Sequence, residues 1–180
     1  MFADRIEKDR QNGLKRPIKI MIVGIPNVGK STLINRITKK SVAETGDRPG
    51  VTRTKQWVRL KEGIEMLDTP GILPPKFEDN ESAKKLAFTG AIKDEIMDIE
   101  ELACELAMYL RDNYAKGLCE RYKIDEDISN LQGYEIVELI GEKRGMLISG
   151  GEIDFLRASN VFVDEFREGK LGGVTLELPQ

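Results

Sequence analysis

The feature that most constrains this chain is the loop sequence GIPNVGKS at residues 24–31, which fits the pattern G-x-x-x-x-G-K-[S/T] without a mismatch. An apolar run at residues 18–23 comes directly before the loop and predicts a buried strand. Leu33, Ile34 and Ile37 follow the loop at helical spacing, which predicts a helix that packs back on this strand. Strand, loop and helix are thus expected in the order that a phosphate-binding P-loop requires.

The residue types in the loop suit a phosphate chain. Gly24 and Gly29 let the backbone curl around the ligand, and the unpaired N–H groups of the following helix N-terminus attract an anion. Lys30 would place a positive charge on the β- and γ-phosphates, and Ser31 would place a hydroxyl on Mg²⁺. The alternative, a chance glycine-rich turn, leaves the flanking strand and helix unexplained. The residues expected to hold the phosphates are Asn27, Val28, Gly29, Lys30, Ser31 and Thr32.

Length and composition indicate a soluble globular protein with one domain, or a small domain with an appendage, in 180 residues. No apolar run approaches the roughly 20 residues of a membrane span, and residues 1–17 lack the apolar core of a signal peptide, so we expect a cytoplasmic protein. Cys104 and Cys119 are far apart and are expected to be reduced thiols. Because the sequence contains no histidine, a histidine metal site or a histidine general base within it is excluded.

Charge is distributed unevenly along the chain. Residues 1–71 contain 15 Lys/Arg and 8 Asp/Glu, whereas residues 72–180 contain 13 Lys/Arg and 23 Asp/Glu, which gives net charges of +7 and −10. A basic first part suits a polyphosphate or RNA partner, although a solvated surface explains most of these charges equally well.

The remaining patterns predict a hairpin and a group of helices. Strands are expected at 57–60 and 64–67 with a tight turn at 61–63. Helical spacing and capping signals predict four helices, at 81–88, from Asp98 to about Tyr114, at 134–142 and at 152–167, as a small helical bundle. Residues 1–16 indicate a short helix or linker that ends near Gly13, and 172–178 indicate a short final strand.

The hairpin would deliver a second motif, Asp68-Thr69-Pro70-Gly71, 38 residues after Lys30. Asp68 is expected to hold a Mg²⁺-bound water, and the Gly71 N–H to meet a γ-phosphate. Between the two motifs lies Thr52, which is expected to complete the Mg²⁺ shell and to sense the γ-phosphate. Thr45 and Thr54 remain alternatives for that role, and a simple loop threonine is the other interpretation.

Together these motifs resemble the translation-factor-like GTPases. The segments PNVGKSTLIN, PGVTR and DTPG are most similar to the circularly permuted ribosome-assembly GTPases, and especially to the ribosome biogenesis GTPase A family. The likeness continues in LPPKFED, LAFTGAIKD, IGEKRG, SGGEIDF and FREGKLGG. The resemblance implies a switch that binds and hydrolyses GTP in assembly of the large ribosomal subunit, with hydrolysis stimulated by the ribosomal particle and a C-terminal helical domain that binds rRNA.

In this family the guanine-reading N-K-x-D and S-A-K segments precede the P-loop. This sequence has no N-K-x-D, and its Ser-Ala-Lys at 82–84 follows the loop within a helical stretch. We therefore expect an N-terminally shortened member of α/β class, in which the P-loop GTPase core has an incomplete sheet and a small all-helical domain follows. The expected divisions are a polar helix or linker at 1–17, a partial GTPase domain at 18–84 and a helical domain at 85–180 that is expected to bind RNA.

Catalysis is expected from Lys30, Thr52 and Gly71, with a partner's help. Many GTPases place a glutamine after the D-x-x-G motif to orient the attacking water, but here Ile72 follows, and it cannot hydrogen-bond water. The resemblance therefore implies slow intrinsic hydrolysis that a bound partner stimulates. Asn27 is a candidate K⁺ ligand, as in potassium-stimulated relatives, with a plain loop-capping role as the alternative.

Two other functions remain open. The first is a non-catalytic piece that binds rRNA or ribosomes through residues 85–180, and the second is a P-loop ATPase or kinase. No DNA partner is expected.

Five basic residues of the second part form either an rRNA-binding face or a scattered solvated surface. These residues are Lys143, Arg144, Arg157, Arg167 and Lys170.

Overall fold

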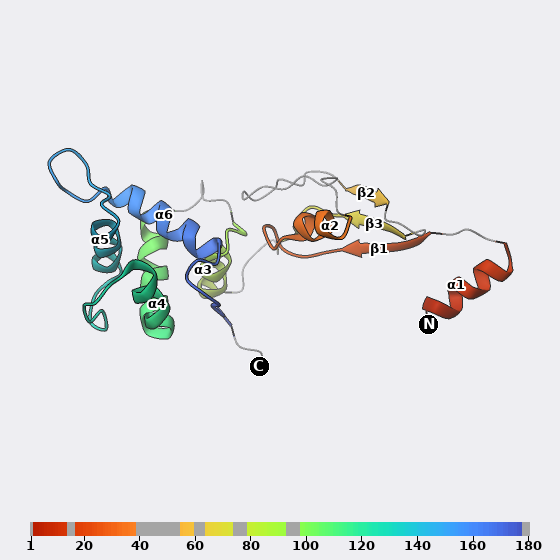
Figure 1. Cartoon of the computed structure of the whole chain (residues 1–180), viewed down its shortest axis with the longest axis horizontal. Coiled ribbons are helices and arrows are strands. Elements are labelled where there is room, and N and C mark those ends of the chain that lie inside the picture. The colour runs from red at the N-terminus through yellow and green to blue at the C-terminus, as the bar shows by residue number, and fades with distance from the viewer. Residues whose placement is uncertain are drawn as a thin grey trace. The chain divides into compact units, whose positions relative to one another are not determined.

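The computed structural model describes residues 2–13, 17–38, 55–59, 64–73, 79–92 and 98–177 (Figure 1). The chain divides into two units, Met1–Pro75 and Lys76–Gln180, and each is described by itself below. The boundary expected between residues 84 and 85 would cut through the helix α3 (Asn80–Phe88), which packs against other helices of the second unit.

The first unit holds the predicted strand, loop and helix. It contains α1 (Phe2–Gln11), β1 (Ile18–Ile22), α2 (Lys30–Thr38), β2 (Gln56–Arg59) and β3 (Ile64–Asp68). The sheet order is β1-β3-β2, with β1 parallel and β2 antiparallel to β3. The predicted hairpin is thus confirmed in its two strands, while its turn at 61–63 lies outside the described residues.

The core of the first unit is small. Ile34 of α2 is buried with Val58 of β2 and Met66 of β3. The expectation that β1 is a buried strand is wrong for the described residues, because Ile20 is 40% and Met21 60% exposed. A parallel strand becomes buried when neighbours flank it and helices cover both faces of its sheet. Here β3 pairs with one edge of β1, and α2 packs on one face of the sheet.

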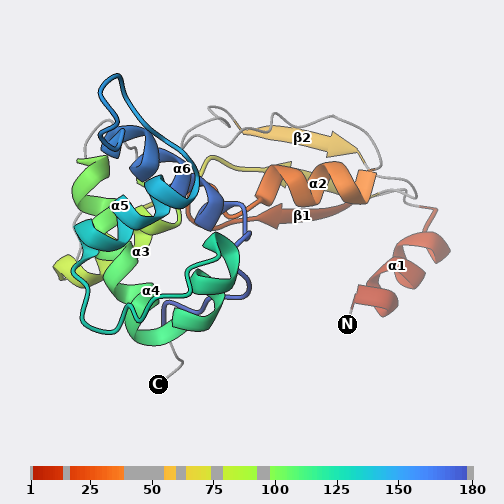
Figure 2. The same ribbon diagram turned by 60° about the vertical axis from the view of Figure 1, so that its left-hand side comes forward.

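The second unit is helical and has a large core. Besides α3 it contains α4 (Ile99–Tyr122), α5 (Gly133–Lys143) and α6 (Phe155–Arg167), which pack against one another (Figure 2). Asp98 caps α4, as predicted, by accepting hydrogen bonds from the N–H groups of Glu100 and Glu101. Within the described part of the chain, no helix combines the length and the apolar character that crossing a membrane requires.

Two helix boundaries and one expected strand differ from the predictions. Helix α4 continues to Tyr122, past Tyr114, where the backbone leaves helical geometry at φ −141° and ψ 31°. Helix α6 begins at Phe155 because Asp154 caps it and the preceding Ile153 pairs with Leu147 in an antiparallel bridge. Residues 172–177, the described part of the expected final strand, form no strand.

Candidate functional site

The loop between β1 and α2 has the backbone geometry of an anion-binding turn. Asn27 and Gly29 adopt left-handed conformations, with φ 60° and φ 85°, and α2 begins immediately afterwards at Lys30. Glycine suits the second of these positions because a side chain there would be strained. The amides of the loop and of the first helical turn, including those of Val28 and Thr32, are therefore grouped at a helix N-terminus that favours an anion.

The Lys30 amine folds back over this loop. Its Nζ donates hydrogen bonds to the carbonyl oxygens of Gly24, at 3.2 Å, and Ile25, at 2.7 Å. Burial lowers the pKa of Lys30, and the nearby Asp68 carboxylate partly opposes that effect. The amine therefore lies against the backbone at the start of the loop.

Ser31 and Asp68 join the two motifs directly. The Ser31 Oγ donates a 2.8 Å hydrogen bond to Oδ2 of Asp68, a residue that is only 1% exposed at the end of β3. The other carboxylate oxygen, Oδ1, is buried and has no hydrogen-bond partner among the described residues. A buried carboxylate oxygen without a partner is costly and calls for an explanation such as an ion or its bound water. A hydroxyl beside a carboxylate is a suitable donor set for Mg²⁺.

Thr69 was missed by the sequence analysis as a residue that shapes the site. It is 4% exposed, and its Oγ1 donates a 2.6 Å hydrogen bond to the carbonyl oxygen of Ile22, at the end of β1. This bond ties the start of the 69–71 loop to the strand that leads into the P-loop. The available signal was a hydroxyl residue at the end of the predicted strand 64–67, directly after Asp68.

The loop at Gly71 lies against the P-loop. A Cβ added to Gly71 would lie 2.4 Å from the nitrogen and 2.5 Å from the Cα of Pro26, so no larger residue fits without backbone movement. The next residue, Ile72, donates its N–H to the Gly24 carbonyl oxygen at 3.2 Å, and its side chain is 67% exposed. The predicted positions 68 and 71 therefore do meet the P-loop. Thr52, with its alternatives at 45 and 54, lies outside the described residues.

The basic residues considered for an rRNA face are mostly engaged within the second unit. Lys143 pairs with Glu126 at 2.8 Å, and Lys170 pairs with Glu168. Arg167 donates hydrogen bonds to the carbonyl oxygens at the end of α3. Arg157 is exposed and makes no ion pair among the residues that the structure describes.

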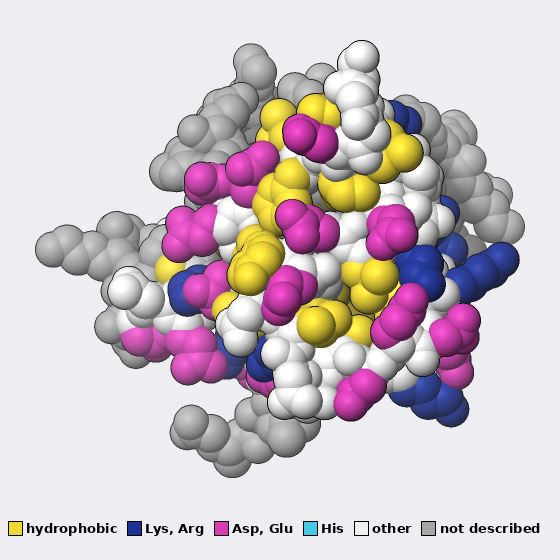
Figure 3. Space-filling model, turned by 90° about the vertical axis from the view of Figure 1, so that its left-hand side faces the viewer, with side chains coloured by type: hydrophobic (Ala, Val, Ile, Leu, Met, Phe, Trp, Pro, Cys, Tyr) yellow, Lys and Arg dark blue, Asp and Glu magenta, His cyan; other side chains and the backbone are white. Residues whose placement is uncertain are grey.

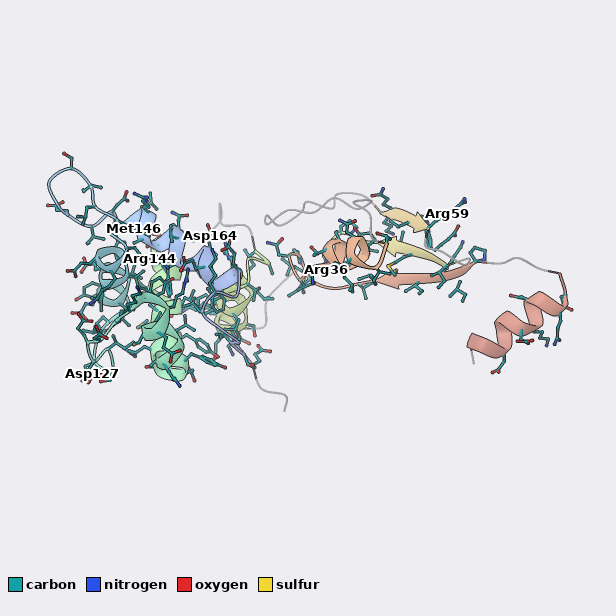
Figure 4. The ribbon with its side chains drawn as sticks, in the orientation of Figure 1. Arg36, Arg59, Asp127, Arg144, Met146 and Asp164 are labelled. Atoms are coloured by element: carbon teal, nitrogen blue, oxygen red, sulfur yellow. The ribbon has the colours of Figure 1, made fainter. Side chains whose placement is uncertain are left out.

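Arg144, labelled in Figure 4, belongs to a network centred on Glu165 of α6. Glu165 also accepts hydrogen bonds from Arg121, at 2.7 and 3.0 Å, and from the Tyr122 hydroxyl, at 2.9 Å. Burial would raise the pKa of Glu165, but the hydrogen bonds from Arg121 and Tyr122, together with the positive charges of Arg144 and Arg121, hold that pKa below its usual value. Burial, helped by the bond to Glu165, raises the pKa of Tyr122. This network joins α4, α6 and the end of α5.

Known proteins of one family are similar to this chain. The family model described as "50S ribosome-binding GTPase" matches residues 19–143. Ribosome biogenesis GTPase A of Bacillus cereus is 45% identical over 181 aligned residues, which cover 100% of this chain and 60% of the relative. The protein of the same name from Thermotoga maritima is 35% identical and matches 92% of this chain and 58% of its own length.

Two solved structures are similar as well. A GDP-bound structure of the protein named TM YlqF has a TM-score of 0.56 and 30% identity, with 97% of this chain and 66% of that chain covered. A GNP-bound YlqF from T. maritima has a TM-score of 0.53 and 28% identity, with 93% and 62% covered.

This chain belongs to the 50S ribosome-binding GTPase family. The resemblance to ribosome biogenesis GTPase A sequences is confirmed over the whole chain, and with it the expected class, a P-loop GTPase core of mixed α/β type with a small incomplete sheet, followed by helices. The chain spans about three fifths of the length of the curated relatives that it matches.

Proposed function

We propose that this chain carries the GTP-binding and GTP-hydrolysing switch of a cytoplasmic protein that acts in assembly of the large ribosomal subunit. The observation that carries the proposal is the Ser31–Asp68 pair at the P-loop. Its 2.8 Å hydrogen bond engages one carboxylate oxygen, and the second is buried without a partner in the part of the chain that the structure describes. Such an oxygen suits a water held by Mg²⁺, and Mg²⁺ accompanies nucleotide phosphates in sites of this kind.

The binding roles follow from the geometry of the loop. The amides of residues 27–32 would hold the phosphates, and Lys30 would exchange its bonds to two loop carbonyls for bonds to β- and γ-phosphate oxygens. Ser31 and Thr52 would ligate Mg²⁺, and Asp68 would act through a bound water. When bound, Mg²⁺ neutralises charge that develops on the phosphate oxygens. Gly71, held against Pro26, would direct its N–H to the γ-phosphate.

The chemistry is attack of water on the γ-phosphorus. A bond forms between the water oxygen and phosphorus, the bond from phosphorus to the β–γ bridging oxygen breaks, and GDP and phosphate leave with the protons of the water. At the position where many GTPases have glutamine, Ile72 is exposed and has no polar side-chain atom to orient the water. We therefore propose slow intrinsic turnover, stimulated by the ribosomal particle, with Asn27 as a candidate K⁺ ligand in the left-handed turn.

Membership of the family supports the choice of GTP and of a ribosomal partner. The two YlqF structures are of proteins bound to GDP and to GNP, and the family description names binding to the 50S particle. In the proposed cycle the GTP form docks on an rRNA surface of the large-subunit precursor, and hydrolysis releases it.

The test is a titration of the 180-residue chain, and of a version extended to the length of its relatives, with GTP and ATP in the presence of Mg²⁺. Hydrolysis is then measured with and without K⁺ and large subunits. We expect GTP to bind more tightly than ATP, Ser31→Ala to weaken the Mg²⁺ dependence and large subunits to accelerate turnover. ATP binding at least as tight as GTP binding would indicate an ATPase or kinase. Retained rRNA binding by Lys30→Ala, with no nucleotide effect on it, would indicate a non-catalytic binding piece.

A further inference from the structure

One end of the second unit presents apolar and acidic side chains together. Figure 3 shows this face, on which hydrophobic and Asp/Glu side chains alternate across the centre while the described Lys and Arg lie mainly toward the rim. At this end lie α5 and the loop that leads into α6 (Figure 1). We call the exposed residues that carry the argument the outer face: Tyr134, Glu138, Glu142, Leu147, Ile148, Glu152 and Leu156.

Three of these residues form a stripe along α5. Tyr134, Glu138 and Glu142 are spaced four residues apart, which places them on one side of the helix, and all three are exposed. Tyr134 is 53% exposed, so its ring is available to a partner. The stripe thus presents one aromatic ring followed by two carboxylates.

A short hairpin continues this face beyond the end of α5. Leu147 pairs with Ile153, and the Ile148 N–H donates a 2.9 Å hydrogen bond to the Glu152 carbonyl oxygen. The base of the hairpin lies on α5, because a Cβ added to Gly141 would be only 2.6 Å from Cγ2 of Ile153. Since residue 141 directly precedes Glu142, the hairpin begins beside the acidic stripe.

The hairpin exposes apolar side chains that other described residues leave uncovered. Leu147 is 50%, Ile148 47% and Leu156, in the first turn of α6, 53% exposed. Large aliphatic side chains that are exposed and close together in sequence are typical of a binding surface, because a partner that covers them removes apolar area from water.

The two glutamates of the stripe stand at positions where their charges destabilise the helix. Like charges four residues apart repel each other, and Glu142 lies in the last turn of α5, where the helix dipole favours a cation. The two basic residues that follow form their ion pairs elsewhere, Lys143 with Glu126 and Arg144 with Glu165, although the charge of Lys143 still attracts Glu142. A charge pattern that opposes local stability is typical of a binding surface.

We propose that the outer face docks a basic segment of a partner protein, in which apolar side chains alternate with Lys or Arg. The apolar residues of that segment would cover Leu147, Ile148, Leu156 and Tyr134, and its cations would meet Glu138, Glu142 and Glu152. The charge pattern selects this occupant, because an RNA phosphate backbone would be repelled by the same carboxylates. The outer face belongs to the second unit and the P-loop to the first, and the proposal does not depend on nucleotide binding.

The test uses the full 180-residue chain and a fluorescein-labelled peptide of lysine and leucine, with leucine at positions i, i+3, i+4 and i+7. Fluorescence anisotropy measures its affinity at low and high salt. Polylysine, a glutamate–leucine peptide of the same pattern and an RNA hairpin are compared with it. We expect the lysine–leucine peptide to bind best and to weaken at high salt. Polylysine binding at least as tight as that of the lysine–leucine peptide, or displacement of the bound peptide by the RNA hairpin, would overturn the proposal.

Variants locate the surface. Leu147→Ser combined with Leu156→Ser is expected to weaken the lysine–leucine peptide about tenfold. The control Ile37→Ser changes a 50% exposed isoleucine of the first unit and is expected to leave affinity unchanged. An equal loss in both would show that exposed apolar residues act nonspecifically and would overturn the assignment.

The acidic stripe gives a second, independent readout. Glu138→Gln with Glu142→Gln should lower peptide affinity and its salt dependence, while the thermal midpoint stays the same or rises, because repulsion along α5 is relieved. Glu120→Gln with Asp164→Asn removes the same charge from residues that are 69% and 71% exposed in their side chains, outside this face. If this control weakens the peptide as much as the stripe variant does, binding reflects net charge alone and the proposal is wrong.

Discussion

The two units of this chain distribute stability and chemistry differently. Among the described residues, three buried apolar side chains form the core of the first unit, whereas nineteen form that of the second. Yet the first unit holds the P-loop, the Ser31–Asp68 pair and the Gly71 contact with Pro26. The second unit has no comparable set of phosphate-binding features in its described part. A motif with strict local geometry can therefore form on a scaffold that contributes little packing of its own.

The largest expected effect tests whether the second unit dominates stability. Phe162 is fully buried, and its ring meets that of Tyr122 edge-on, with centroids 6.0 Å apart. Phe162→Ala should lower the free energy of unfolding by about 3–5 kcal/mol, through lost burial and the cavity left behind. Urea denaturation followed by circular dichroism measures it, with Leu156→Ala, at a 53% exposed position, as the control. Equal losses in the two variants would contradict the core assignment.

The next effect concerns the chemistry of the first unit. Gly71→Ala would place a Cβ 2.4 Å from the Pro26 nitrogen and push the two loops apart. Because displacement of reacting groups by about 1 Å can cost on the order of 100-fold in rate, we expect a GTP turnover loss of that size. Global unfolding should change little, since the second unit sets it. Gly173→Ala is the matched control, because a Cβ there meets nothing within 4 Å.

Local patterns of sequence predicted most of the elements. The P-loop, the hairpin strands and α5 follow from a fixed motif or from periodicity within one segment, and such signals need no knowledge of the rest of the fold. The expected meeting of Lys30 and Ser31 with Asp68 followed from the spacing of two motifs. The predicted start of α6 at residue 152 is wrong because the next residue, Ile153, pairs with Leu147 in a bridge, and no local pattern indicates that pairing.

Features that depend on distant partners could not be predicted. Ile20 and Met21 look like core residues by composition, but their burial depends on what packs beside β1. The Glu165 network joins residues 21 to 44 positions apart, and no periodic pattern indicates that a glutamate on α6 will be buried. Arg144 was consequently considered a candidate RNA contact, whereas the structure shows that it pairs with Glu165.

An effect of intermediate size concerns the second unit, where the stability that Glu165 contributes depends on pH. The pKa of Glu165 is held below its usual value of 4.5, so its carboxylate stabilises the fold above that pH and the contribution is lost as pH falls through the lower, folded-state pKa. Glu165→Gln should cost about 1.5–3 kcal/mol near neutral pH, because two arginines and a tyrosine lose a charged partner. The loss should shrink at about pH 3.

Urea midpoints at both pH values measure this effect. Glu168→Gln, which also removes a carboxylate near the end of α6 but at an exposed position, is the control. A penalty that stays constant between the two pH values would mean that shape, and not charge, makes Glu165 important.

The smallest expected effect bears on why the first unit is so sparsely packed. Met21 is 60% exposed on β1, and it faces the side of the sheet opposite Ile34, in the same row as Leu67 and the half-exposed Trp57. Met21→Thr should therefore change the free energy of unfolding of this chain by less than about 0.5 kcal/mol. In a version extended to the length of its relatives, any segment that covers this face would raise the cost to roughly 1–3 kcal/mol. Chemical denaturation of both versions, followed by Trp57 fluorescence, measures the difference. Equal small costs in the two would show that this face of the sheet stays open, and that the contrast between the two units belongs to the GTPase core itself.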